Sequence, residues 1–179
     1  MSALKDLEGI LGRRLSKVAK ILLSTTGSVT ATLEVVSGLE VKVETRFQGV
    51  VKAGELPLRP PLEAMGLHER ERVNIREVWL ATSERRLAFA ISLSPTSRLE
   101  PSFSGDLTRA DVPIGKLLSL HEIESRREIR EIGLLAKIPS FLKSGFGLSG
   151  DALVAFRSYD VIRHAQVMME IYEFFHPML

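Results

Sequence analysis

The fold is decided near the end of the chain, by Arg157-Ser158-Tyr159-Asp160-Val161-Ile162 and, shortly after it, Val167-Met168-Met169-Glu170-Ile171-Tyr172-Glu173-Phe174-Phe175. Both segments are largely apolar and of strand length, and His164-Ala165-Gln166 joins them, so they predict a β-hairpin. The polar side chains of two adjacent strands are then expected to face one cavity.

The second of these strands carries two carboxylates. Side chains alternate between the faces of a strand, which places Glu173 and Glu170 on opposite faces. Both faces are apolar, so the alternation does not choose between the two acids. A carboxylate in such surroundings either reaches solvent at an edge or lies in an apolar pocket, where desolvation raises its pKa and suits it to proton transfer.

Upstream segments predict three more strands. Residues 73–81 and 87–93 are rich in β-branched and aromatic side chains and are separated by a turn at 82–86. On the first of them Arg76 shares a face with Asn74, Val78 and Leu80, so we expect it to point inward. Charged and apolar residues alternate over residues 40–47, which predicts one exposed face and one buried face that includes Phe47.

The N-terminal region predicts helices. Apolar residues recur every three or four positions from about residue 3 to 23, as on the buried face of a single helix. Ser28 is a suitable cap for a short second helix through Val36, and Gly38 is its expected stop.

The remaining segments are less regular. Residues 54–67 contain three prolines and predict a long loop, and residues 125–135 fit a helix or a strand equally well. Pro113 predicts the start of a short helix, with Asp111 as its expected cap. Strands outnumber helices without βαβ alternation. We therefore predict a single domain over residues 1–179 of α+β class, with a mainly antiparallel sheet and helices on one face.

The amino-acid composition limits the classes of ligand, chemistry and cellular location that fit this protein. The 24 Lys and Arg against 22 Asp and Glu leave a net charge of +2, which is a weak basis for nucleic-acid binding and is compatible with a small anionic ligand. Cysteine is absent, which excludes disulfides and thiolate chemistry. No signal-like start or membrane-length apolar run occurs, so we expect a cytoplasmic location. Sixteen arginines and only three amide side chains suggest a heat-adapted source.

Three motif classes are set aside. Residues 145–150 match G-x-G-x-x-G, but the strand before and the helix after that a dinucleotide site needs are not predicted, so we interpret them as a loop. The four histidines lack metal-ligand spacing, and no G-x-S-x-G elbow supplies a serine nucleophile. No metal or other cofactor is therefore expected.

Four segments, taken in order, carry a family resemblance. They are Ser28-Val29-Thr30-Ala31-Thr32-Leu33-Glu34, Arg76-Glu77-Val78-Trp79-Leu80, Pro113-Ile114-Gly115-Lys116-Leu117-Leu118, and Arg157-x-Tyr159-x-Val161 followed by Ile171-x-Glu173-x-x-x-Pro177. Their collinear order over about residues 24–179 resembles the chorismate lyase (chorismate pyruvate-lyase) family. The spacing from Glu173 to Pro177 matches that family and selects Glu173 over Glu170.

The resemblance implies a six-stranded antiparallel sheet and a ligand enclosed beneath two flaps. It also implies cofactor-free cleavage of chorismate to 4-hydroxybenzoate and pyruvate, with Arg76 on the ring carboxylate and Glu173 serving the ring hydroxyl or the proton transfers. The implied catalytic residues are Glu173 and Arg76, and the implied substrate-binding residues are Arg76, Arg157, Val29, Ile114, Gly115 and Tyr159.

In one position this sequence lacks a basic residue that the family uses, and this bears on which substrate the protein binds. The bacterial enzymes carry a second arginine on the strand that corresponds to residues 87–93, and this strand has no basic residue. Either Arg157 binds the enolpyruvyl carboxylate, or the chain belongs to a divergent branch with another ligand.

Other interpretations stay open at this point. Arg76 would be structural if it paired with a neighbouring glutamate, Arg157 if its strand lay at an edge, and Glu173 if it faced solvent. The fold also resembles ligand-binding domains of bacterial transcription regulators, which sense small molecules without converting them. Only some 23 residues precede the first flap, too few for a winged helix, so a sensor would need a separate DNA-binding partner.

Overall fold

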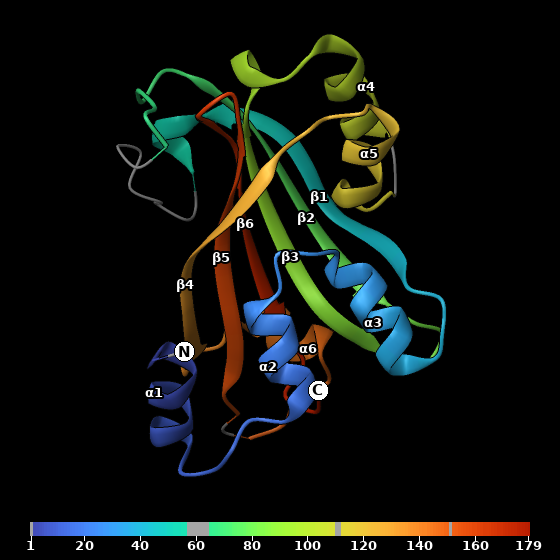
Figure 1. The fold of residues 1–179 in the computed structure, drawn as a ribbon, viewed down its shortest axis with the longest axis vertical. Helices are drawn as coiled ribbons and strands as arrows, with labels where there is room; N and C mark the ends of the chain where they lie inside the picture. Colours follow the sequence, from blue (N-terminus) through green and yellow to red (C-terminus); the bar gives the residue numbers. More distant parts are fainter. Residues whose placement is uncertain (1, 57–64, 110–111, 151) are drawn as a thin grey trace.

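The computed structural model describes residues 2–56, 65–109, 112–150 and 152–179. Its centre is a six-stranded antiparallel sheet with the order β1-β2-β3-β6-β5-β4 (Figure 1). The strands are β1 (Lys42–Lys52), β2 (Arg72–Ala81), β3 (Arg86–Pro95), β4 (Arg126–Leu135), β5 (Val154–Arg163) and β6 (Gln166–Phe175). The predicted α+β class with an antiparallel sheet is confirmed, and residues 125–135, which fitted helix or strand equally well, form a strand.

The C-terminal hairpin is the predicted one, with a tighter turn. His164 and Ala165 connect β5 to β6 with positive φ angles of 50° and 61°, and Arg163 pairs with Gln166. Two residues with φ > 0 match the twist that flanking strands require of a two-residue turn. Strand β6 also pairs with β3, which joins the β1-β2-β3 half of the sheet to the C-terminal half.

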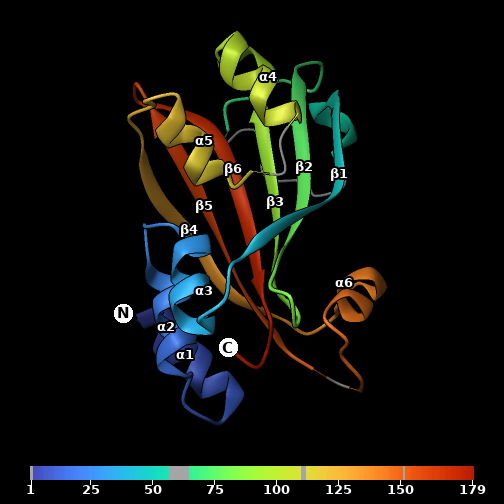
Figure 2. The same cartoon turned by 90° about the vertical axis from the view of Figure 1, so that its right-hand side faces the viewer.

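Helices cover mainly one face of the sheet. Figure 2 shows α1, α2, α3 and α5 on one side and α6 on the other. The helices are α1 (Ser2–Leu11), α2 (Lys17–Ser24), α3 (Val29–Ser37), α4 (Pro101–Arg109), α5 (Ile114–Leu120) and α6 (Ser140–Gly145), with 3-10 turns at Ala53–Glu55 and Thr96–Arg98. No helix in the described ranges is long and apolar enough to cross a membrane.

Each face of the sheet has its own core. On the side of α1–α3, Val78 and Ala88 pack against Leu22, Leu23 and Leu33. On the opposite side Trp79 and Phe89 pack against Leu142 and Phe146 from α6 and its C-cap. Because both faces are covered, β2 and β3 are buried along almost their whole length, polar residues such as Arg76 included.

The expectation of one N-terminal helix was wrong. Helix α1 ends at Leu11, and Gly12 follows in the left-handed conformation with φ of 61°. Ser16 then caps α2, its hydroxyl accepting a hydrogen bond from the Ala19 N–H at 2.9 Å. The apolar period continues across the break because both helices pack on the same core, so periodicity alone conceals the boundary.

The next helix follows its predicted signals. Ser28 is the N-cap of α3, and Gly38 ends the helix in the left-handed conformation with φ of 68°. Glycine adopts this conformation without the steric penalty of a Cβ.

Phe47 is exposed (44%), contrary to the prediction that it lies on the buried face of its strand. The β1–β2 register shifts between Thr45 and Phe47, so the alternation set by buried Val41 and Val43 reverses beyond Arg46.

Helices α4 and α6 were not predicted. Both are short, and α6 ends in the glycine-rich stretch that was interpreted as a loop. The N-cap of α5 is Pro113 rather than Asp111, which lies outside the described residues together with most of the predicted loop over residues 54–67.

Candidate functional site

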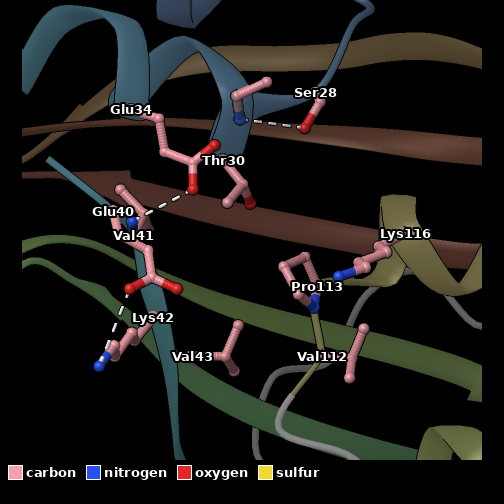
Figure 3. A pocket seen from close by; sticks show the side chains of 11 residues that line it. Ser28, Thr30, Glu34, Glu40, Val41, Lys42, Val43, Val112, Pro113 and Lys116 are labelled. Atoms are coloured by element: carbon pink, nitrogen blue, oxygen red, sulfur yellow. Dashed lines mark hydrogen bonds and ion pairs between the residues drawn. The ribbon is translucent and has the colours of Figure 1, made fainter. Parts of the chain in front are cut away.

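Two adjoining pockets open on the helix-covered face of the sheet. The inner cavity has a volume of about 60 Å³, and the outer pocket has a volume of about 550 Å³ (Figure 3). Side chains that line both are Ser28, Thr30, Val43 and Pro113. These shared residues form the boundary between the cavity and its entrance.

Two short segments make this boundary, and we call them the first flap (residues 28–31) and the second flap (residues 112–116). The first flap is the start of α3, where the Ser28 hydroxyl accepts a hydrogen bond from the Ala31 N–H at 3.2 Å. The second flap leads into α5 through Pro113. Figure 3 shows Ser28 and Thr30 on one side of the outer pocket and Pro113 with Lys116 on the other. Residues of both flaps line the inner cavity as well as the outer pocket.

Arg76 reaches the inner cavity from β2. Its exposed fraction is 2%, and its Nη2 donates a hydrogen bond to the Val112 carbonyl oxygen at 3.0 Å. The inward orientation predicted from strand alternation is confirmed. The glutamate next to it, Glu77, pairs instead with Arg46 of β1, so this in-sheet carboxylate is engaged elsewhere.

Glu173 is buried within the hairpin rather than facing solvent. Its exposed fraction is 5%, and it lies directly opposite Arg157 in the β5–β6 register. Arg157 Nε donates to Glu173 Oε2 at 2.7 Å, and the Tyr159 hydroxyl donates to Glu173 Oε1 at 3.2 Å. Both carboxylate oxygens are therefore oriented by protein donors, and Glu173 lines the inner cavity.

Arg157 lies behind Glu173. It is fully buried, donates through Nη1 to the Thr25 carbonyl, and holds its guanidinium carbon 4.9 Å from the centre of the Tyr159 ring. Its strand β5 is paired with β6 and β4, so it is not at an edge of the sheet. Arg157 is absent from the residues that line the inner cavity, where a substrate-binding role would put it.

The pKa of Tyr159 is raised, first by burial and then by the negative charge of Glu173. Its phenol consequently stays protonated and remains a hydrogen-bond donor to Glu173 over the whole range in which the protein would work.

Arg127 is a cavity residue that sequence analysis missed. Arg127 of β4 lies within the charged run of residues 126–131, yet it is half-buried and lines the inner cavity. Its Nη1 donates to the carbonyl oxygens of Thr26, at 2.9 Å, and Gly27. Arg127 is two positions from Ile129, so in a strand the two side chains share a face, and this spacing could have predicted that Arg127 points inward. The surrounding charged residues made an exposed segment the more obvious interpretation.

Glu170 belongs to the other face of β6. It accepts a hydrogen bond from the Tyr172 hydroxyl at 2.7 Å, and burial raises its pKa. The choice of Glu173 as the cavity acid therefore agrees with the geometry. No group of three or more His, Asp or Glu side chains suited to a metal ion occurs in the described part of the chain.

Six of the seven predicted site residues meet at the inner cavity. These six residues are Val29, Arg76, Ile114, Gly115, Tyr159 and Glu173. They come from four separate parts of the chain, namely α3, β2, α5 and the β5–β6 hairpin, which the fold brings together.

Solved structures share this fold at low sequence identity. PhnF from Mycobacterium smegmatis matches with a TM-score of 0.69 and 13% identity, over 86% of this chain and 65% of that one. Its effector domain alone matches with a TM-score of 0.68 and 12% identity, over 85% of this chain and 90% of the domain. The protein described as "the putative transcriptional regulator from Streptomyces coelicolor" matches with a TM-score of 0.62 and 15% identity, over 78% of this chain and 89% of that one.

Sequence comparison identifies a nearer relationship. "Putative lyase MJ0807" of Methanocaldococcus jannaschii is 36% identical over 161 residues, covering 87% of this chain and 76% of that protein. Residues 23–179 match the family described as "Chorismate pyruvate-lyase Rv2949c-like". The chain therefore belongs to the Rv2949c-like family of chorismate pyruvate-lyases.

Proposed function

We propose that this protein cleaves chorismate to 4-hydroxybenzoate and pyruvate without a cofactor. The observation that carries the proposal is the inner cavity, which is lined by the buried side chain of Arg76, by the oriented carboxylate of Glu173 and by residues of the two flaps. Membership of the family supports the reaction class.

Arg76 is the proposed ligand of the ring carboxylate. A guanidinium group binds a carboxylate through two parallel hydrogen bonds, which orients the ring as well as attracting it. Arg76 is buried at the cavity wall and also holds the Val112 carbonyl of the second flap. Ligand binding at Arg76 would thus be linked to the position of that flap.

The proposed reaction is an elimination that needs only acid–base groups. The C4 hydrogen leaves as a proton, the C3–O bond breaks, and the two electrons of the former C–H bond form the C3–C4 double bond that makes the ring aromatic. The released enolpyruvate takes up a proton on its methylene carbon and becomes pyruvate. A correctly placed proton acceptor accelerates such a step by about 10²–10⁴.

Glu173 is the proposed acceptor. Its two oxygens already accept hydrogen bonds from Arg157 and Tyr159, and each oxygen keeps a second acceptor position. One of these positions suits the ring hydroxyl or the proton that leaves C4. Arg157 and Tyr159 act through Glu173 and are positioning residues in this mechanism.

Substrate entry requires the flaps to part. The inner cavity of about 60 Å³ is far smaller than the roughly 300 Å³ or more of typical ligand sites, whereas the outer pocket holds about 550 Å³. Val29 and Ile114, one from each flap, would then close over the bound ring and exclude water.

Incubation of the purified protein with chorismate, followed by chromatography, tests the proposal. We expect 4-hydroxybenzoate and pyruvate in equal amounts, with a rate unaffected by chelator. Product formation that is lost on chelation and restored by a metal ion would contradict the cofactor-free mechanism. Binding of 4-hydroxybenzoate with chorismate left intact would favour a ligand sensor instead.

A further inference from the structure

The proposed reaction leaves one charge of the substrate without an assigned partner. Chorismate carries a second carboxylate on its enolpyruvyl group, and residues 87–93 of β3 include no basic side chain to bind it. Among the described residues that line the inner cavity, the cations are Arg76 and Arg127.

These two arginines approach the cavity from different parts of the sheet. Arg76 is on β2 and Arg127 on β4, with β3, β6 and β5 between them. At about 4.8 Å between neighbouring strands, their backbones are roughly 19 Å apart along the sheet. This arrangement suits a ligand whose two carboxylates point in different directions from one ring.

Arg157, the other arginine near this site, uses two of its three side-chain nitrogens within the protein. Its Nε pairs with Glu173 and its Nη1 with the Thr25 carbonyl, whereas its Nη2 is buried without a hydrogen-bond partner among the described residues. Arg157 lies outside the cavity lining, so we assign the second carboxylate to a cation that lines the cavity.

Arg127 lies where the two flaps meet. Its Nη1 holds the carbonyls of Thr26 and Gly27, immediately before the first flap. Its Nη2 is next to Gly115 of the second flap, because a Cβ added to Gly115 would be 3.4 Å from that nitrogen. Its guanidinium carbon is 5.8 Å from the centre of the Tyr159 ring, which itself contacts Glu173.

We infer that Arg127 binds the second carboxylate, that of the enolpyruvyl group, and so determines the preference for a two-carboxylate ligand. This inference rests on the proposed function for the identity of the ligand. The Arg127 guanidinium also donates hydrogen bonds to Thr26 and Gly27, just before the first flap. A carboxylate bound to Arg127 would therefore contact the side chain that holds this flap in place.

The test compares three ligands: two that do not react, by calorimetric titration, and chorismate by its KM in initial-rate assays. 4-Hydroxybenzoate has one carboxylate, whereas chorismate and the stable aromatic analogue 3-(carboxymethoxy)-4-hydroxybenzoate have two. We expect Arg127→Gln to weaken both two-carboxylate ligands by roughly 10- to 100-fold, the effect of losing a hydrogen bond to a charged group. Its affinity for 4-hydroxybenzoate should stay within about threefold of wild type, whereas Arg76→Gln should weaken all three ligands.

Controls separate binding from folding. Arg126→Gln changes the neighbouring exposed arginine, which pairs with Glu128, and should alter no affinity. If Arg127→Gln has a lowered melting temperature, Arg127→Lys replaces it in the test. Lysine keeps the charge but loses the two parallel hydrogen bonds of a guanidinium group, so we expect an intermediate loss of affinity for the two-carboxylate ligands alone.

The outcomes distinguish this inference from the proposed function. Chorismate turnover with two-carboxylate affinities unchanged in Arg127→Gln would overturn the inference alone. An Arg127-dependent preference for the two-carboxylate analogue without chorismate turnover would overturn the proposed reaction alone. Equal weakening of all three ligands in Arg127→Gln, or no preference for two carboxylates in the wild type, would also overturn the inference.

Discussion

Arg157 Nε donates a hydrogen bond to Glu173 Oε2 at 2.7 Å, between two buried residues that face each other across the β5–β6 pair. Glu173 lines the inner cavity and Arg157 lies behind it, so the carboxylate proposed for catalysis also belongs to the structural core. Variants of either residue therefore change folding and chemistry together, and experiments have to separate the two effects.

Removing only the cation should destabilise the protein. Arg157→Met leaves Glu173 as a buried charge that has lost its ionic partner, for which we expect a loss of about 3–5 kcal/mol in the free energy of unfolding. Urea denaturation measures this loss. The double variant Arg157→Met/Glu173→Leu should recover most of the stability, because it buries no charge. A double variant no more stable than Arg157→Met would show that packing, not charge, is responsible.

The two acids of β6 should differ in their effect on turnover. Glu173→Gln is expected to lower turnover by about 10²-fold or more, because an amide does not accept the proton. Glu170→Gln, on the opposite face, should leave turnover within a few-fold. Initial rates are to be taken below the melting temperature of each variant, because Glu173→Gln also leaves Arg157 without its carboxylate. Equal loss in both variants would contradict a specific role for Glu173.

Arg76 should contribute to ligand affinity. Arg76→Ala removes a buried guanidinium from the cavity wall, and we expect binding of 4-hydroxybenzoate to weaken by about 1.5–3 kcal/mol. Calorimetric titration of the folded variant gives this difference. Unchanged affinity would assign Arg76 the structural role of holding Val112.

Glu170 should make stability depend on pH. Burial raises its pKa above the ordinary value of 4.5, and its Oε2 has no hydrogen-bond partner among the described residues. Its favourable contribution is thus complete below about pH 4.5 and is lost as pH rises through the folded-state pKa. Melting curves of wild type and Glu170→Gln should agree at pH 4, with the variant melting higher at pH 7. A constant difference across this range would rule out titration of Glu170 as the cause.

Two glycines provide a matched packing test. A Cβ on Gly145 would overlap the Trp79 indole, so Gly145→Ala should cost about 1–3 kcal/mol. Gly105, inside α4, has open space around its Cβ position, and Gly105→Ala should stabilise by about 0.5–1 kcal/mol. Thermal melting distinguishes the two by the sign of the shift. Similar shifts would show that Trp79 readily moves aside.

Much of the fold could be predicted because its signals are local. Ser28 and Gly38 mark the ends of α3 through their own backbone preferences, and alternation along residues 73–81 places Arg76 on the inward face. The predictions failed where the local sequence pattern was weak or where pairing with another strand changed the face on which a residue lies. Gly12 interrupts a helix whose apolar period continues, and the register shift near Arg46 reverses the face of Phe47.

The sequence by itself determined strands β2 and β3, the ends of α3 and the hairpin that holds Glu173, because each depends on residues only a few positions apart. The tertiary structure decided which charged groups meet. Arg157 is engaged by Glu173 and Thr25, and Arg127 reaches the cavity beside the first flap. Those contacts depend on strand order and register between segments as much as 132 residues apart, which periodicity along one segment does not encode.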